Sequence, residues 1–171
     1  LSFDNPLIFE GEVAGVSSIL GEMIGNGTRS ISKEKFLEEV DFMGASMSVS
    51  GSGAFASSLS RYFPRVLELM ADAILNPLLT QEEFDSQKNL IKESLKTADK
   101  DVATAANRVQ DLITYGASHP NGEFVSQETL NKSELNDAIN YFNNYASPSN
   151  AYLVILGDVN FEDIKVRVTK L

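Results

Sequence analysis

The fold of this chain is decided by the stretch Gly15-Val16-Ser17-Ser18-Ile19-Leu20-Gly21-Glu22-Met23-Ile24-Gly25-Asn26-Gly27-Thr28. Its apolar side chains recur at spacings of three and four, as they do along the buried face of an α-helix. These positions, with one just before the stretch, are Val13, Val16, Ile19, Leu20, Met23 and Ile24. Gly25 and Gly27 follow, and glycine commonly ends a helix because it tolerates positive φ. The stretch therefore predicts a helix over residues 13–24.

Periodicity and capping residues predict further helices downstream. Ser32 is an N-cap residue, and Thr80 forms a capping box with Glu83. Pro64 is well suited to the first turn of another helix. Asn160 caps the last predicted helix. The predicted helices cover residues 33–43, 64–75, 81–98, 102–115, 133–145 and 160–171.

Other segments have the patterns of β-strands. Residues 45–50 and 54–60 alternate small polar with apolar side chains on either side of a glycine-rich break, which predicts an antiparallel pair. Residues 151–156 form an uninterrupted apolar run, which predicts a strand buried on both faces. Residues 1–4 also alternate, as a short strand would. Together these elements predict an α+β fold, with helices on one face of a mainly antiparallel sheet, in a single domain over residues 1–171.

Composition excludes several classes of function. The 171 residues include 24 acidic and 14 basic side chains, giving a formal net charge of −10. This balance opposes nucleic-acid binding, which depends on basic side chains that displace counterions from phosphates. Cysteine is absent, which excludes disulfides, thiolate metal sites and cysteine nucleophiles. No apolar run approaches the roughly 18 residues of a membrane span, so we expect none in this chain.

The stretch that predicts the first helix resembles the zinc-binding helix of the insulinase/pitrilysin family of peptidases. That family reads Gly-Leu-Ala-His-Phe-Leu-Glu-His-Met-Leu-Phe-Lys-Gly-Thr here, which contains the inverted zinc motif His-x-x-Glu-His. The opening glycine, the apolar positions, the methionine and the closing Gly-Thr are shared. At the two histidine positions this chain has Ser18 and Glu22, and Gly21 stands where the family has its catalytic glutamate. The resemblance therefore implies a peptidase fold without its catalytic residues.

The third zinc ligand of the family is a glutamate on the helix predicted for residues 81–98. The resemblance places it at Glu93 or Ser94, depending on a one-residue offset. A catalytic zinc site takes about three protein ligands and an open position for water, so we expect no metal, no cofactor and no catalytic residue here. The alternative is a hydrolase that holds Mg²⁺ or Ca²⁺ through Glu22 and Glu93. We expect His119, the single histidine, to have a structural role.

The resemblance continues across nearly the whole chain. Shared features include Asn76-Pro77 after a helix, His119-Pro120 in a loop and Gly157-Asp158 after the apolar run. They imply the LuxS/processing-peptidase-like sandwich, here without the first strands, and hence a partial domain of a longer multi-domain protein. Family members carry two or four such domains, which enclose a peptide, and commonly one half lacks zinc. The implied partner is a second insulinase-type domain, in the same protein or in another subunit.

The resemblance also singles out one strand as a binding element. In the family, the edge strand that follows the second helix receives extended peptides by strand addition. Its residues in this chain are Ala45, Ser46, Met47, Ser48 and Val49. The other interpretation is an edge that is covered, or blunted to prevent aggregation. The sequence thus predicts an inactive, chamber-forming peptidase domain, with an independent peptide-binding module as an alternative. Its serine- and asparagine-rich character is most similar to bacterial members of the periplasm or cell envelope.

Overall fold

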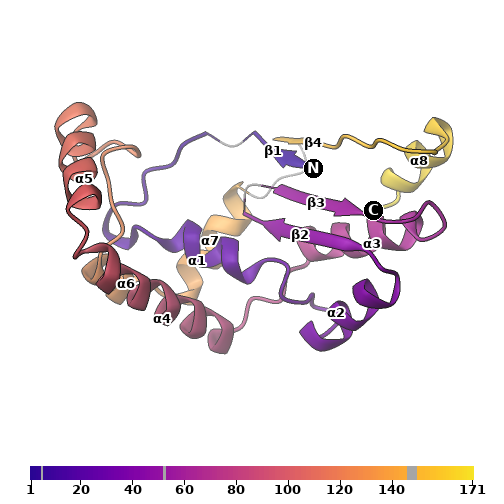
Figure 1. The fold of residues 1–171 in the computed structure, drawn as a ribbon, viewed down its shortest axis with the longest axis horizontal. Helices are drawn as coiled ribbons and strands as arrows, with labels where there is room; N and C mark the ends of the chain where they lie inside the picture. The colour runs from indigo at the N-terminus through magenta and orange to yellow at the C-terminus, as the bar shows by residue number, and fades with distance from the viewer. Residues whose placement is uncertain (5, 52, 146–149) are drawn as a thin grey trace. The chain divides into compact units, whose positions relative to one another are not determined.

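The computed structural model describes residues 1–4, 6–51, 53–145 and 150–171, and it contains two compact units (Figure 1). The sheet unit comprises Leu1–Asp4, Met23–Leu78 and Ala146–Leu171. The helical unit comprises Asn5–Glu22 and Leu79–Tyr145. In the part of the chain that is described, no helix combines the length and the apolar character that crossing a membrane requires.

The sheet unit combines a small sheet with helices. Its elements are β1 (Ser2–Phe3), α2 (Lys33–Phe42), β2 (Ser46–Ser50), β3 (Gly53–Ser57), α3 (Phe63–Leu75), β4 (Ala151–Tyr152) and α8 (Phe161–Val168). The strands lie in the order β2-β3-β1-β4, and each neighbouring pair is antiparallel. This arrangement confirms the predicted α+β fold with a mainly antiparallel sheet.

The hairpin of β2 and β3 is the longest paired part of the sheet. Its register pairs Ser46 with Ser57, Met47 with Ala56, Ser48 with Phe55, Val49 with Ala54 and Ser50 with Gly53. Gly53 lies where β1 approaches closely, because a Cβ atom there would clash with the carbonyl oxygen of Leu1. Any larger residue at Gly53 would therefore force β1 and β3 apart.

Helix α3 supplies most of the core of the sheet unit. One apolar cluster joins it to α2 and β2, and its buried members are Phe36, Val40, Met43, Val66, Leu69 and Ala73. A second cluster packs α3 against β3 and β1, and its buried members are Ala54, Leu67, Met70 and Ile74. Burying a Leu or Met side chain contributes about 1.5–3 kcal/mol, so this helix accounts for much of the unit's stability.

The helical unit is built from η1 (Gly11–Val13), α1 (Val16–Met23), α4 (Gln81–Ala98), α5 (Val102–Tyr115), α6 (Gln127–Lys132) and α7 (Leu135–Tyr145), the last residue of α1 belonging to the sheet unit. Caps fix several of these ends. The side chains of Thr80, Asp101 and Ser126 accept hydrogen bonds from backbone N–H groups in the first turns of α4, α5 and α6. The sequence therefore encodes these helix starts locally.

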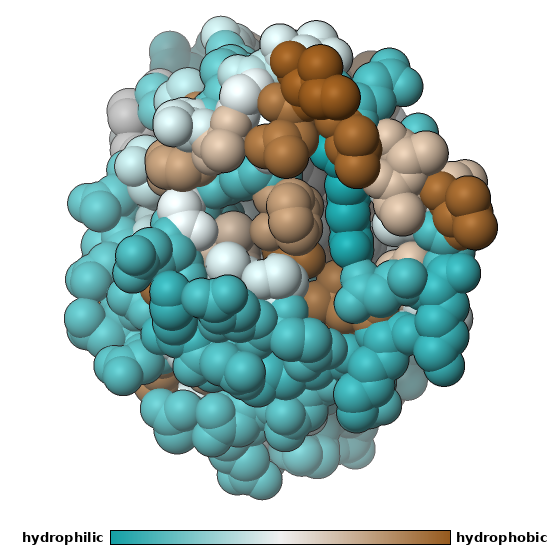
Figure 2. All heavy atoms as spheres, turned by 90° about the vertical axis from the view of Figure 1, so that its left-hand side faces the viewer, coloured by the Kyte–Doolittle hydropathy of each residue, from teal (hydrophilic) through white to brown (hydrophobic). Residues whose placement is uncertain are grey.

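Helix α5 differs from its neighbours because none of its described residues is buried. Val102, Val109 and Ile113 are 82%, 56% and 79% exposed. Figure 2 views the end of the molecule at which α5 lies, and apolar side chains are gathered in the upper part of that view. The helix thus presents an apolar stripe to its surroundings.

One predicted strand differs from the structure, and one helix of the structure was not predicted. The strand predicted over residues 151–156 and buried on both faces is wrong: β4 has two residues, and Leu156 is 92% exposed. The reason is that β4 pairs only with β1 among the described strands, and that pairing involves Ser2 and Phe3 alone. Helix α6 was not predicted, because its six residues are too few to display a helical apolar period.

Candidate functional site

The residues at the family's motif positions lie together on one face of α1. Ser18, Gly21 and Glu22 are spaced by three and four residues, so their side chains share a face of the helix. Ser18 and Glu22 are exposed. The opposite face carries the buried residues Val16, Ile19, Leu20 and Met23. The helix therefore presents a hydroxyl, a glycine and a carboxylate where the motif would present two imidazoles and a carboxylate.

The two candidates for a third ligand lie on α4, and both are exposed. The carboxylate of Glu93 forms an ion pair with Lys96, at 2.5 Å between Oε1 and Nζ. Within the described residues, no group of three or more His, Cys, Asp or Glu side chains is placed to hold a metal ion. The structure thus does not assemble Glu22 and Glu93 into a three-ligand site.

Helix α1 is anchored by a residue that precedes it. The carboxylate of Glu10 accepts hydrogen bonds from the N–H groups of Gly15, Val16 and Ser17, at 2.6, 2.9 and 3.2 Å. Helix N-termini leave such N–H groups without internal partners, and a negative charge is favourable there. Glu10 therefore acts as the cap of α1 from five residues before Gly15.

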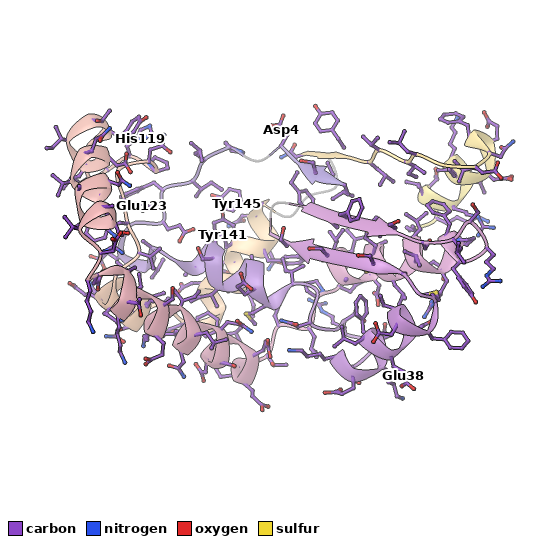
Figure 3. The ribbon with its side chains drawn as sticks, viewed as in Figure 1. Asp4, Glu38, His119, Glu123, Tyr141 and Tyr145 are labelled. Atoms are coloured by element: carbon purple, nitrogen blue, oxygen red, sulfur yellow. The ribbon has the colours of Figure 1, made fainter. Side chains whose placement is uncertain are left out.

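A second carboxylate holds Glu10 in place. Glu123, in the loop that precedes α6, accepts from the N–H of Glu10 at 3.0 and 3.1 Å and from that of Gly11 at 2.9 Å (Figure 3). The hydroxyl of Thr129, on α6, donates to the carbonyl of Ala14 at 2.8 Å. These contacts connect the loop before α1 to a segment more than a hundred residues later, which fixes the start of the helix.

Gly15 is required at this junction. Its φ is +108°, and a Cβ atom there would lie 2.8 Å from Val125 and 2.9 Å from Leu130. The opening glycine of the motif therefore serves close packing within the helical unit.

Tyr141, on α7, lies near the same helix end (Figure 3). Burial raises the pKa of its phenol, and the negative charge of Glu10 raises it further, while a hydrogen bond with the side chain of Ser17 acts in the opposite direction. The phenol is thus held in its neutral form, in a region of negative potential.

The predicted binding strand lies at an edge of the sheet. Ser46, Met47, Ser48 and Val49 belong to β2, and β2 is the first strand in the sheet order. Ala45 lies just before it, and its N–H donates to the carbonyl of Val40 at 3.1 Å. The side chains of Met47 and Val49 pack on the core, whereas those of Ser46 and Ser48 are exposed.

The hydrogen bonds of β3 show which backbone groups of β2 point outward. The N-terminal ammonium of Leu1 donates to the carbonyl of Ala54 at 2.7 Å, and the N–H of Ala54 donates to the carbonyl of Leu1 at 2.9 Å. The backbone groups of Ala54 therefore point toward β1. Its partner in β2, Val49, is therefore at a non-hydrogen-bonded position, and so is Met47 two residues away. The N–H and C=O of both residues consequently point away from β3, toward the outer edge.

Part of this edge is approached by the loop after α1. A Cβ atom on Gly25 would lie 3.4 Å from the carbonyl oxygen of Val49. The loop after α1 thus approaches the outer edge of β2 closely at Val49.

His119 lies in the loop after α5 and is exposed. Its ring stacks on Tyr115 with centroids 5.3 Å apart, and its Nδ1 accepts from the N–H of Asn121 at 3.1 Å. These contacts stabilise the loop and agree with a structural role.

Sequence reasoning did not identify Glu10, Ser17, Glu123 or Tyr141 as neighbours. Glu10 and Glu123 are separated by 113 positions, and no motif connects them. An acidic residue shortly before a helix that lacks its own N-cap side chain is the one local signal that was present for Glu10.

Comparison with known proteins identifies the family and the fold to which these residues belong. The family described as Insulinase (Peptidase family M16) matches residues 10–115, more than half of the chain. A crystal structure of a protease from Helicobacter pylori is similar with a TM-score of 0.82 at 18% sequence identity. The likeness covers 99% of this chain but 42% of that protease chain, and at this identity it shows the fold. Among curated proteins, none matches.

Proposed function

The chain belongs to the insulinase family of peptidases, and from this premise we propose that it is a catalytically silent domain of that family. Its role is to pair with a second insulinase-type domain, in the same protein or in a partner subunit, and so to form part of a chamber that encloses a peptide. The observation that carries the proposal is the exposed face of α1, which bears Ser18, Gly21 and Glu22.

The donor atoms of this face do not fit a catalytic zinc ion. A neutral serine hydroxyl is a poor zinc ligand, and Gly21 offers no side chain to act as a base. Glu22 supplies one carboxylate, and Glu93 is already paired with Lys96. These donor atoms support a structural or binding role for the domain rather than a catalytic role in which a metal ion activates water.

The test of silence measures metal binding and peptide hydrolysis separately. The purified chain should hold no stoichiometric zinc, and neither zinc, Mg²⁺ nor Ca²⁺ should raise its melting temperature or promote hydrolysis of an unstructured peptide. The control is the quadruple variant Ser18→His, Gly21→Glu, Glu22→His and Ser94→Glu, in which the last substitution supplies the third ligand. Its zinc affinity should exceed that of the parent by at least about a hundredfold, because imidazole ligands are restored. Hydrolysis by the parent chain that a chelator abolishes would refute silence and favour the unusual-ligand hydrolase.

The pairing proposal is supported by size and by family membership. The chain spans 42% of the Helicobacter pylori protease chain that it resembles. Cross-linking and mass spectrometry on cells that produce the complete protein should therefore connect this domain to a second domain of the same family. Cross-links that connect it only to unrelated proteins would contradict pairing.

A second candidate function, peptide binding by strand addition, is favoured by one observation. Met47 directs its backbone N–H and C=O away from β3, toward the outer edge of β2, which is the first strand in the sheet order. This edge could receive an extended peptide with or without a partner domain.

A further inference from the structure

A pocket of about 300 Å³ opens beside the first turn of α1 and lies within the helical unit. One part of its lining is polar and consists of Glu10, Ser17, Ser18, Glu123 and Tyr141. Ligand sites in proteins begin at about this volume and combine apolar walls with a few converging polar groups. The pocket therefore has the size for one long side chain or one small molecule.

The apolar part of the lining comes from loops on both sides of the polar groups. It includes Leu7 and Ile8 before η1, and Phe124 and Val125 before α6. Leu7 is 70% exposed and Phe124 is 45% exposed, so these side chains are accessible to a ligand. They offer contact to an aliphatic chain.

The charged groups in the lining are both carboxylates. Glu10 and Glu123 accept hydrogen bonds from backbone N–H groups, and within the described residues neither of them forms an ion pair. A carboxylate has about four lone-pair sites, so each can accept from one further donor. Arg108, which is not part of the lining, lies over the ring of Phe124 at 5.5 Å and is paired with Asp99 at 2.6 Å. The lining thus contains no basic side chain that pairs with either carboxylate.

The hydroxyl groups of the pocket also favour a ligand that donates hydrogen bonds. Ser17, Ser18 and Tyr141 can each accept a hydrogen bond from a cation. The phenol of Tyr141 is neutral at neutral pH, so it can also donate to a neighbouring oxygen. An ammonium group has three donors and no acceptor, and it matches a lining rich in acceptors.

We propose that this pocket binds an alkylammonium group, with the amine facing Ser18, Tyr141 and the two carboxylates and the methylene chain along Leu7 and Phe124. The group can come from a free aliphatic amine or from a lysine side chain in a peptide. The inference rests on the pocket alone and holds whether or not the domain is silent or paired.

The test is a titration of the chain with matched small molecules, followed by amide NMR shifts. The probes are pentylamine, N-acetyl-lysine amide and the uncharged isostere N-acetyl-norleucine amide. Both amines should shift the resonances of Ser17, Ser18 and Tyr141 in a saturable way, with an affinity at least about tenfold higher than that of the norleucine probe. Tighter binding of the lysine probe than of pentylamine would identify a peptide source, and the reverse a free amine.

A pair of variants separates pocket binding from general attraction to an acidic protein. Ser18→Lys places a competing ammonium at the pocket, and because Ser18 is exposed the fold should persist, as checked by circular dichroism. Ser86→Lys changes the net charge equally at an exposed position on α4 outside the lining. Amine binding should weaken at least about tenfold in Ser18→Lys and stay unchanged in Ser86→Lys. Equal binding of the neutral isostere, equal weakening in both variants, or no saturable shift by the amines would overturn the proposal. None of these results depends on peptide hydrolysis or on a partner domain.

Discussion

At the scale of single residues, the start of α1 depends on side chains that lie outside the helix. A serine or aspartate at the N-cap position usually satisfies one N–H group, whereas Glu10 accepts from three. Its own backbone is held in turn by Glu123. The position of the motif face is therefore controlled by two carboxylates that are not part of the motif.

Replacing Glu10 tests this arrangement. Glu10→Ala should lower the free energy of unfolding by about 1–3 kcal/mol, because hydrogen bonds to a charged group are lost and the N–H groups of α1 lose their acceptor. Urea denaturation measures the change. The matched control is Glu12→Ala, an exposed glutamate in η1 whose side chain makes only a 3.9 Å ion pair with Lys132. Equal effects of the two substitutions would contradict a capping role for Glu10.

At the scale of elements, β2 packs the side chains of Met47 and Val49 on the core and directs the backbone groups of the same residues to its outer edge. Met47 and Val49 both direct backbone groups outward, but only Val49 is crowded by Gly25. The alternation of exposed serines with apolar residues allows one face to be solvated while the other contributes to the core.

Met47→Pro tests peptide binding at this edge. Proline removes the outward N–H of Met47 without removing a hydrogen bond to β3, so affinity for an extended peptide should fall at least about tenfold while the fold is retained. Met47→Leu keeps the N–H and the apolar side chain, and it should bind as the parent does. Fluorescence anisotropy with a labelled extended peptide measures both, and circular dichroism verifies folding. Unchanged binding by Met47→Pro would exclude strand addition.

The elements that sequence predicted correctly are those with local signals. Ser32, Thr80 and Asn160 cap α2, α4 and α8 through their own side chains, so those helices begin where the sequence indicates. The apolar residues 151–156 have no local signal comparable to a capping residue. Their continuous apolar character does not reveal how many strands pair with them. The packing of Tyr141 beside Glu10 was equally hidden, because it is created by the tertiary fold.

At the scale of the whole molecule, acidic groups that are stabilised by the fold predict how stability depends on pH. A hydrogen bond from Arg65 lowers the pKa of Glu39 and outweighs the effect of burial. Burial would raise the pKa of Asp72, but hydrogen bonds from Thr28, Ser30 and Asn76 outweigh it and the pKa is lowered. Both groups lie in the sheet unit and connect segments that are distant in sequence.

The sheet unit should therefore lose stability in acid. Each lowered pKa contributes stability that is present above the unfolded value, about 3.9 for Asp and 4.3 for Glu, and is lost as the pH falls through the folded value. The urea midpoint should accordingly fall between about pH 5 and pH 3. Asp72→Asn should reduce this dependence, whereas Asp41→Asn, at an exposed aspartate on α2, should leave it unchanged. An identical acid profile in all three proteins would contradict the role of Asp72.

The cap supplied by Glu10 has a consequence for how this helix can change. Because Glu10 holds α1 from the preceding loop, side chains on the exposed face of the helix can be substituted without removing the hydrogen bonds at its N-terminus. The residues that would bind a metal are therefore independent of those that hold the helix in place. Metal ligands, or other functional side chains, could be introduced on the exposed face of α1 without changing how the helix is anchored.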